Sequence, residues 1–404
     1  MLATVIGLIG TLVQARFVGP EDLGFLRQFG IFTAYAYFMN LGLSDALQRM
    51  YPLYIGQGKR RQALAVAEIC QAWSAGLAAV ISGIFLLLAL VSFGQGNWRA
   101  ALAWLVQALS ITGFTYGVYL SATYRSGHEF IAVAKSSVVG SVANLFTLPC
   151  FMFFPYVALI LRNSMGNLAS LVYLHCRRPL HLSWRFNWRE WYGLARQGIP
   201  LFTASYGTAT GWSAAEATLI VKLLGTSSLG LWAVSMTFLE MANKVAQSIS
   251  AVYVPRVIEE YGRTGSVRAC LHLCRRPMLW SIVPVSLMGL AACVVLPFII
   301  PWLTPKYAAA IPTMCLVMLY LPLIILEMPY QLVVAKGQWV WMNVFSYTSL
   351  GCFALLACYS ARMGLGLNGI VGASLLGRSI RLGMIYLFVG VEARRERLAQ
   401  GVAI

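Results

Sequence analysis

The sequence predicts an all-α membrane protein that crosses the bilayer about twelve times, in two parallel lobes of six helices. Of the 404 residues, 59% are hydrophobic and only 11% are charged, and the mean hydropathy is +0.72. A soluble domain of this length is far more polar. Apolar runs of about 20 residues, the length that a helix needs to span a bilayer, recur along the chain. A short motif from the start of the chain also returns near its middle.

The first lobe contains six apolar runs with short polar gaps between them. We expect its spans at residues 2–18, 25–47, 64–92, 99–123, 136–154 and 157–175. The first run is the weakest, because about 17 residues rising 1.5 Å each barely cross the hydrocarbon core. Residues 1–176 are therefore predicted to form the N-lobe.

A basic and aromatic stretch, residues 177–198, follows the first lobe. It places Trp184, Trp188 and Trp191 on one helical face and arginines elsewhere, which predicts an amphipathic helix at the cytoplasmic membrane surface. This helix serves either as a plain linker or as part of a gate. Six further spans are expected at 199–222, 231–253, 277–300, 312–334, 339–361 and 369–391. Residues 199–391 then form the C-lobe, and residues 392–404 form a cytoplasmic tail.

The basic residues predict the orientation, because cytoplasmic loops retain Lys and Arg. If the N-terminus is inside, most of the 30 basic residues fall in inner loops, and the outer loops hold only Arg16, Arg99, Lys222, Lys306 and Arg362. Both termini are therefore expected in the cytoplasm. The same distribution explains the formal net charge of +17 as a topological signal, so the charge does not indicate a nucleic-acid-binding protein.

An internal repeat divides the chain into halves. The segment "RFVGPEDLG" at Arg16–Gly24 has a fainter copy, "KLLGTSSLG", at Lys222–Gly230, and a basic loop introduced by proline follows each copy after one further span. Because each predicted lobe has an even number of spans, both copies enter the membrane from the same side. Arg16 and Lys222 thus occupy equivalent places, which puts two cations at the outer mouth or makes them anchors in the headgroup region.

Several motifs resemble one transporter family over nearly the whole chain. They are "ARFVGPEDLG", "LGLSDALQR", "YIGQGKRRQA", "RFNWREW" joined to "RQGIPLF", and "PKYAAAIP". Together they are similar to the polysaccharide-exporter branch of the MOP superfamily, the Wzx-type O-antigen and lipid-linked oligosaccharide flippases, which are relatives of the lipid II flippase and of the MATE multidrug exporters. The motifs are loops and helix ends, without a catalytic signature.

The resemblance implies a flippase of the bacterial inner membrane that works by alternating access. Its cargo would be a polyprenyl-pyrophosphate-linked oligosaccharide, moved from the cytoplasmic to the outer leaflet for polysaccharide or O-antigen biosynthesis. Membrane lipids, a polysaccharide polymerase and chain-length proteins would be its partners. Two alternatives remain open: a MATE-like exporter of cationic drugs, whose cavity should be more acidic, and a membrane-embedded glycan-assembly enzyme, although no Asp-x-Asp motif occurs. We therefore do not expect an enzyme.

Buried cations suit a pyrophosphate cargo, because a charge inside the bilayer persists mainly where it has a function or a partner. Arg378 and Arg381 lie one turn apart in the last predicted span, so they share a helix face near mid-membrane. They either line a binding cavity or pair with a carboxylate such as Glu327. Arg162 and Arg27 are further cavity candidates, placed nearer the outer end of their spans.

The acidic residues within spans bear on the driving force. Glu216, Glu240 and Glu327 could carry a proton or Na⁺ across the membrane. Pro329 follows Glu327 closely and frees backbone carbonyls beside it, although a salt bridge to an arginine would also explain Glu327. Lys244 is a further candidate for cargo binding, but Glu240 lies one turn before it and could neutralise it. No Cys or His spacing indicates a metal site, so H⁺ or Na⁺ is the only cofactor-like species expected.

Overall fold

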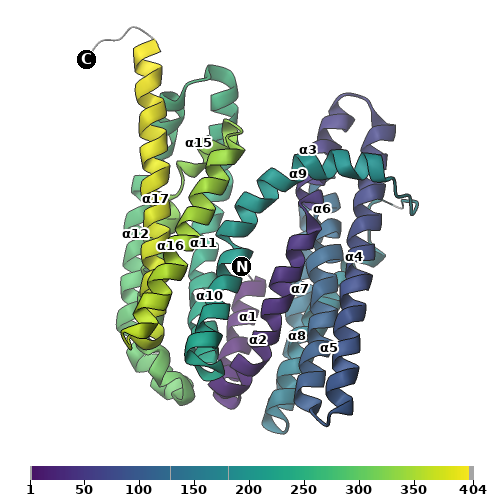
Figure 1. Cartoon of the computed structure of the whole chain (residues 1–404), viewed down its shortest axis with the longest axis vertical. Helices are drawn as coiled ribbons and strands as arrows, with labels where there is room; N and C mark the ends of the chain where they lie inside the picture. Colours follow the sequence, from purple (N-terminus) through teal and green to yellow (C-terminus); the bar gives the residue numbers. More distant parts are fainter. Residues whose placement is uncertain (1, 128, 181, 400–404) are drawn as a thin grey trace. The chain divides into compact units, whose positions relative to one another are not determined.

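The computed structural model describes residues 2–127, 129–180 and 182–399, without the side chains at 2–5, 8, 244–256, 258, 259, 262, 335 and 399. These residues are almost entirely helical and include no β-strand, as the sequence predicts (Figure 1). The chain divides into two compact units, Met1–Ala214 and Ala215–Ile404. Each unit is described below by itself.

The first unit is a bundle of membrane-length helices and shorter segments. Figure 1 shows α4, α5, α7 and α8 running side by side within it, and the packing of α4 on α5 and of α7 on α8 is extensive. Its elements are α1 (Leu2–Phe17), α2 (Pro20–Ala36), η1 (Tyr37–Asn40), α3 (Leu43–Gly56), α4 (Arg60–Gly94), α5 (Trp98–Thr112), η2 (Gly113–Gly117), α6 (Val118–Ser126), α7 (Phe130–Leu145), η3 (Pro149–Met152), α8 (Pro155–Cys176) and α9 (Trp188–Thr208). Helix α10 (Thr210–Leu224) crosses the division between the units.

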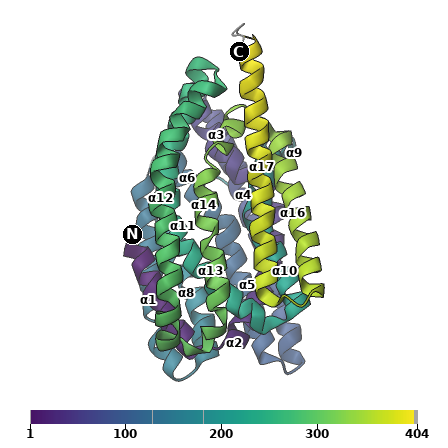
Figure 2. The ribbon, with the colours of Figure 1, turned by 90° about the vertical axis from the view of Figure 1, so that its left-hand side faces the viewer.

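The described part of the second unit contains four long helices and a chain of short ones. Figure 2 shows α12, α13, α14 and α17 side by side, in agreement with their packing contacts. The elements are α11 (Thr226–Thr264), α12 (Val267–Leu303), η4 (Pro305–Ala310), α13 (Ile311–Met318), α14 (Tyr320–Leu326), α15 (Tyr330–Ala335), α16 (Trp339–Arg362) and α17 (Gly366–Ala399). Glu396 near the end of α17 accepts hydrogen bonds from the backbone N–H groups of Val267 (2.8 Å) and Arg268 (3.2 Å), which fastens α17 to the first turn of α12.

Eight helical runs in the described part of the chain are long and apolar enough to cross a membrane. They are Arg60–Gly94, Trp98–Ser126, Phe130–Met152, Pro155–Cys176, Val267–Leu303, Pro305–Leu326, Trp339–Arg362 and Gly366–Leu398. The protein is therefore a multi-pass membrane protein. The four other predicted spans are the first two of each predicted lobe, and they correspond to α1, α2 with α3, α9 with α10, and α11. These segments are shorter, interrupted or less apolar, so the total of twelve stays a prediction.

The two copies of the repeated motif build the same local structure. In the first copy, α1 ends at Phe17 and Gly19 caps the start of α2. In the second copy, α10 ends at Leu224 and Gly225 caps the start of α11. In both copies the basic residue of the motif lies in the last turn of the preceding helix. The sequence repeat is therefore also a repeat of a helix–glycine–helix corner.

The start of α9 belongs to the core of the first unit. Leu194 and Ala195 are buried in a cluster with residues of α3, α4 and α6, and the Trp191 ring lies 4.9 Å from that of Trp73. Trp188 is 67% exposed, and its ring lies 5.3 Å from that of Trp191. Helix α9 joins the second half of the amphipathic segment to the first half of the following predicted span, which explains why the compact unit extends past residue 176, where the predicted N-lobe ends. Trp184 precedes this helix in a non-helical stretch, so the prediction that it shares a helical face with Trp188 and Trp191 is wrong.

Two glycines let α9 approach the break before α3. Gly42 has a φ of +72°, a backbone conformation that glycine adopts without strain. A Cβ on Gly198 would overlap the carbonyl group of Gly42, and a Cβ on Gly42 would lie 2.6 Å from the Cβ of Phe202. Small residues permit such close helix packing in membranes.

We expect Gly198→Val to destabilise the protein by about 1 to 3 kcal/mol, because the added side chain must push α9 away from Gly42. The measurement is the midpoint of thermal unfolding in detergent. Gly193→Ala is the matched control on the same helix, since a Cβ there meets no atom within 4 Å. Equal midpoints for the two variants would contradict the tight crossing.

Candidate functional site

The second unit holds a group of four charged residues inside its helices: Glu216, Glu327, Arg378 and Arg381, here called the charge cluster. Arg378 and Arg381 are one turn apart on α17, so the helix projects both from the same face. Glu216 lies on α10, and Glu327 follows the last residue of α14. Helices distant in the sequence thus supply the four groups.

Pro329 explains the position of Glu327. A proline cannot continue a helix, and the chain breaks between α14, which ends at Leu326, and α15, which begins at Tyr330. The carbonyl groups of Leu323 and Ile325 accept hydrogen bonds from the N–H groups of Glu327 (3.0 Å) and Met328 (3.2 Å). The carbonyls near the break therefore already have partners within the turn.

Arg381 and Glu327 form a salt bridge. The guanidinium nitrogen of Arg381 lies 2.8 Å from the carboxylate oxygen of Glu327, and the exposed fractions of the two side chains are 6% and 24%. The Arg381 guanidinium also lies over the ring of Tyr330, 4.8 Å from its centre. The cation is therefore held between a carboxylate and an aromatic face.

Arg378 and Glu216 form the second part of the charge cluster. The Arg378 guanidinium lies 4.9 Å from the ring centre of Tyr320 and interacts electrostatically with the fully buried Glu216. Trp232 and Ser374 are the other polar neighbours of that carboxylate. Neither Glu216 oxygen has a hydrogen bond of ordinary length and angle among the described residues. The carboxylate is thus enclosed by polar groups that do not fully satisfy it.

The four side chains of the charge cluster carry no net charge when all are ionised. A buried charge without a partner costs several kcal/mol, whereas a paired one recovers most of that cost. Protonation of either carboxyl group would leave its arginine positive and able to accept a different anion. The arrangement can therefore exchange an internal carboxylate for an external anionic group.

Arg162 has a different environment in the first unit. It lies on α8 and donates hydrogen bonds to α1: to the Gly10 carbonyl, to the side chain of Gln14 (2.7 Å) and to that of Thr11 (3.2 Å). A Cβ on Gly10 would lie 2.9 Å from the guanidinium, so the lack of a side chain at Gly10 leaves room for Arg162. Arg162 therefore ties α8 to α1. Arg27 on α2 is exposed and interacts electrostatically with Arg162.

The remaining predicted site residues lie at the surface of their units or outside the described side chains. Arg16 and Lys222 are exposed in the last turns of α1 and α10. Glu240 is exposed on α11, and the side chain of Lys244 lies outside the described residues. Their predicted roles at the outer mouth, in ion coupling and in cargo binding stay predictions. Within the described part of the chain, no three His, Cys, Asp or Glu side chains come together as metal ligands.

Sequence reasoning missed the aromatic neighbours of the two arginines. Tyr330 lies three residues after Glu327 and one after Pro329, so the local pattern "EMPY" could have indicated it. Tyr320 and Trp232 are far from Arg378 and Glu216 in the sequence, and no periodicity connects them. They come together only through the packing of α10, α11, α14 and α17.

The comparisons with known proteins agree with this architecture. The family described as "Polysaccharide biosynthesis protein" matches residues 13–312. An inward-facing multidrug resistance MATE transporter of the MOP superfamily has a TM-score of 0.70 at 15% identity, covering 98% of this chain and 96% of that one. The lipid II flippase MurJ in an inward closed conformation has a TM-score of 0.70 at 13% identity, covering 96% and 86%. An outward-facing MATE transporter has a TM-score of 0.66 at 14% identity, covering 98% and 93%.

No curated protein matches the sequence. The identities to the solved structures are low, so those similarities establish the fold, which is that of the MOP transporters. The family match extends over most of the chain and includes both copies of the repeated motif. The chain therefore belongs to the polysaccharide biosynthesis protein family.

Proposed function

We propose that the protein is a flippase for a polyprenyl-pyrophosphate-linked oligosaccharide. It moves this cargo from the cytoplasmic to the outer leaflet of the bacterial inner membrane by alternating access, with both termini in the cytoplasm. The family match supports a role in polysaccharide assembly, and the charge cluster is the observation that carries the proposal. O-antigen synthesis is the process we propose, with a polymerase and chain-length proteins acting after the flippase.

In this proposal the arginines of the charge cluster bind the pyrophosphate in place of their own carboxylates. Arg378 and Arg381 are one helical turn apart, and guanidinium groups bind phosphate oxygens in a bidentate manner. Protonation of Glu216 and Glu327 on the cytoplasmic side releases the two guanidiniums to the cargo. Deprotonation on the outer side returns the guanidiniums to the carboxylates and expels the cargo, so that the protons leave together with it. Proton binding and cargo binding are thereby linked.

A proton is the coupling ion that this arrangement favours over Na⁺. Na⁺ needs a shell of oxygen ligands, and the Glu327 carboxylate at the break already faces the Arg381 guanidinium, which repels a second cation. A proton needs no such shell. Arg27, Arg162 and Lys244 remain proposed secondary cargo contacts, Glu240 a secondary coupling residue, and Arg16 and Lys222 cations of the outer mouth.

An exporter of cationic drugs is the second candidate, favoured by the likeness to multidrug resistance MATE transporters. The charge cluster argues against it, because a cationic drug would meet two guanidiniums beside the carboxylates that should attract it. A glycan-assembly enzyme is a weaker candidate, since the structural neighbours are transporters and flippases.

The test uses the purified protein in liposomes that contain a fluorescent polyprenyl-pyrophosphate-linked oligosaccharide. We expect the fraction of probe accessible from outside to rise with time above that of empty liposomes, and deletion of the gene to leave lipid-linked glycan on the cytoplasmic leaflet. Transport of a cationic dye without movement of the glycolipid would instead support the exporter. If the folded protein showed neither glycolipid flipping nor dye transport, both proposals would be contradicted.

A further inference from the structure

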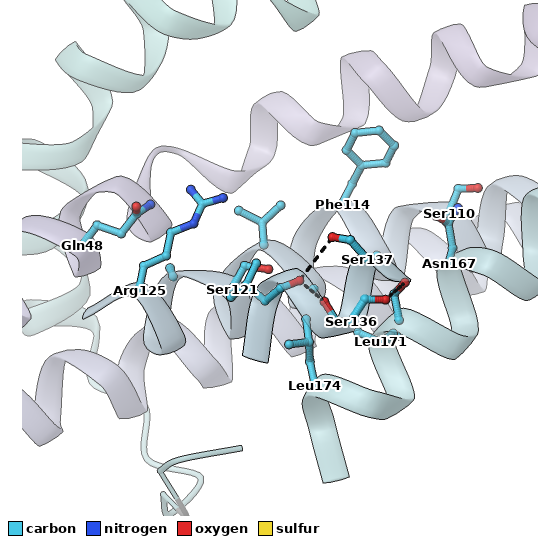
Figure 3. A pocket seen from close by; sticks show the side chains of 16 residues that line it. Gln48, Ser110, Phe114, Ser121, Arg125, Ser136, Ser137, Asn167, Leu171 and Leu174 are labelled. Atoms are coloured by element: carbon cyan, nitrogen blue, oxygen red, sulfur yellow. Dashed lines mark hydrogen bonds between the residues drawn. The ribbon is translucent and has the colours of Figure 1, made fainter. Parts of the chain in front are cut away.

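A polar cavity of about 520 Å³ lies within the first unit, apart from the charge cluster of the second. Its walls come from α3, from the run α5–η2–α6, and from α7 and α8 (Figure 3). Its volume falls in the range of about 300–1,000 Å³ that is usual for small-molecule sites. Its lining combines apolar side chains, such as Phe114 and Leu171, with hydroxyl, amide and guanidinium groups.

Hydroxyl and amide groups form the polar part of the cavity wall. The polar lining away from Gln48 and Arg125 consists of Ser110, Ser121, Ser136, Ser137, Asn167 and Ser170. Ser136 and Ser137 donate their hydroxyl protons to the Val133 carbonyl (2.8 and 3.2 Å), and Ser170 donates to the Ser136 carbonyl (3.0 Å). Their oxygen atoms therefore keep lone pairs that can accept hydrogen bonds from the hydroxyl groups of a ligand.

A single cation stands at one end of this wall. Figure 3 shows Arg125 beside Gln48, with Ser110 and Asn167 at the opposite end. Arg125 lies in the last turn of α6 and is exposed, and no carboxylate lines the cavity. Within the described residues Arg125 forms no salt bridge, in contrast to Arg381. The cavity thus combines a fixed positive charge at its mouth with uncharged hydrogen-bonding groups inside.

The helix that forms one wall departs from α-helical geometry at this place. Residues Gly113–Gly117, between α5 and α6, form a π-helical turn, and Gly113, Phe114 and Gly117 line the cavity. Such turns are rare and occur frequently at functional sites. A Cβ on Gly113 would meet no heavy atom within 4 Å, so the missing side chain leaves free space there.

We propose that this cavity binds a sugar phosphate, with Arg125 holding the phosphate and the serine and asparagine side chains binding the sugar hydroxyls. A guanidinium at the mouth selects an anion, the hydroxyl and amide groups of the wall can hydrogen-bond sugar hydroxyls, and its apolar side chains can pack against the faces of a sugar ring. This assignment rests on the proposed function: the ligand is the sugar–phosphate end of the lipid-linked cargo, which the first unit holds before the cargo reaches the charge cluster.

The first test measures binding directly and does not depend on flipping. The full chain in detergent is titrated with N-acetylglucosamine 1-phosphate, and with N-acetylglucosamine and inorganic phosphate as separate probes, by microscale thermophoresis. We expect the sugar phosphate to bind most tightly. Arg125→Gln should weaken its binding about tenfold or more, because a charge-assisted hydrogen bond is lost.

Two further variants separate a binding defect from a folding defect. Arg49→Gln is the matched control: Arg49 is exposed and follows the lining residue Gln48, but it does not line the cavity. Its affinity should equal that of the unmodified protein. Gly113→Leu should fill the free space and abolish binding, with an unchanged unfolding midpoint. Equal affinity of Arg125→Gln and Arg49→Gln, or no binding to the unmodified protein, would overturn the proposal.

A second test identifies the source of the ligand. If the cavity receives the lipid-linked cargo, soluble sugar phosphate should inhibit flipping in liposomes, and Arg125→Gln should remove this inhibition and raise the cargo concentration needed for half-maximal rate. If the protein bound the sugar phosphate but the sugar phosphate did not inhibit flipping, the assignment of the cavity to the cargo would be overturned. Absence of flipping with intact binding would contradict the proposed function and leave the cavity as a binding site for a soluble sugar phosphate.

Discussion

Replacing Arg381 by methionine is expected to lower the free energy of unfolding by about 3 kcal/mol, because the Glu327 carboxylate then loses its partner inside the helices. Glu327 keeps an exposed side-chain fraction of 24%, so the loss should stay at the lower end of the range for buried pairs. The measurement is the free energy of unfolding in a detergent titration. The double variant Arg381→Met with Glu327→Met should recover most of the loss, since it leaves no unpaired charge.

Arg395→Met on the same helix is the matched control. Arg395 pairs with Glu392 at 3.3 Å, but its side chain is 74% exposed, so water replaces the partner and little stability should be lost. If Arg381→Met were no less stable than Arg395→Met, Glu327 would have to be solvated, and the pair would not hold the last helix.

Replacing Glu216 by glutamine is expected to uncouple transport from the proton gradient. The amide keeps the size of the carboxyl group but cannot be deprotonated, so Arg378 stays available to the cargo. Flipping in liposomes should lose its dependence on an imposed pH gradient while cargo binding is retained. The double variant Glu216→Gln with Arg378→Gln should remain folded, because no buried charge is left unpaired, and should lose flipping.

These two variants separate three explanations of the Glu216–Arg378 pair. A retained gradient response in Glu216→Gln would exclude Glu216 as the coupling group. Normal flipping in the double variant would exclude Arg378 from cargo binding and leave the pair with a structural role. Arg362→Gln, at the exposed end of α16, is the control for a general loss of positive charge.

The fold class was predictable because hydropathy and the internal repeat are patterns that extend over whole helices and do not depend on individual side-chain contacts. Arg378 and Arg381 were predictable as a pair, since three residues make nearly one helical turn and both lie deep in an apolar run. The salt bridge of Arg381 with Glu327 is one of the two outcomes that the sequence left open. The choice between them depends on the packing of α17 against the broken α14–α15 segment, which no local pattern contains.

Other features depended on contacts that the sequence does not reveal. Arg162 was expected to line a cavity or reach outward, but its partners lie on α1, about 150 residues earlier in the chain. The neighbours of Glu216 come from α11 and α17. The polar cavity of the first unit was missed entirely, although "GFTYG" places two glycines four residues apart inside an apolar span. Serines in apolar helices usually bond to their own backbone, so their spacing alone does not predict a cavity.

The net charge of the charge cluster determines how much work the membrane potential does on these residues when they move across the membrane. Its two guanidiniums and two carboxylates sum to zero, so in the proposed transport cycle these four residues contribute no charge movement when the empty protein changes its orientation. Moving one elementary charge through 100 mV involves about 2.3 kcal/mol. The membrane potential therefore neither assists nor opposes the return of these residues, and any voltage dependence that they show arises in the half-cycle in which a proton or an anionic cargo has replaced one of the internal partners.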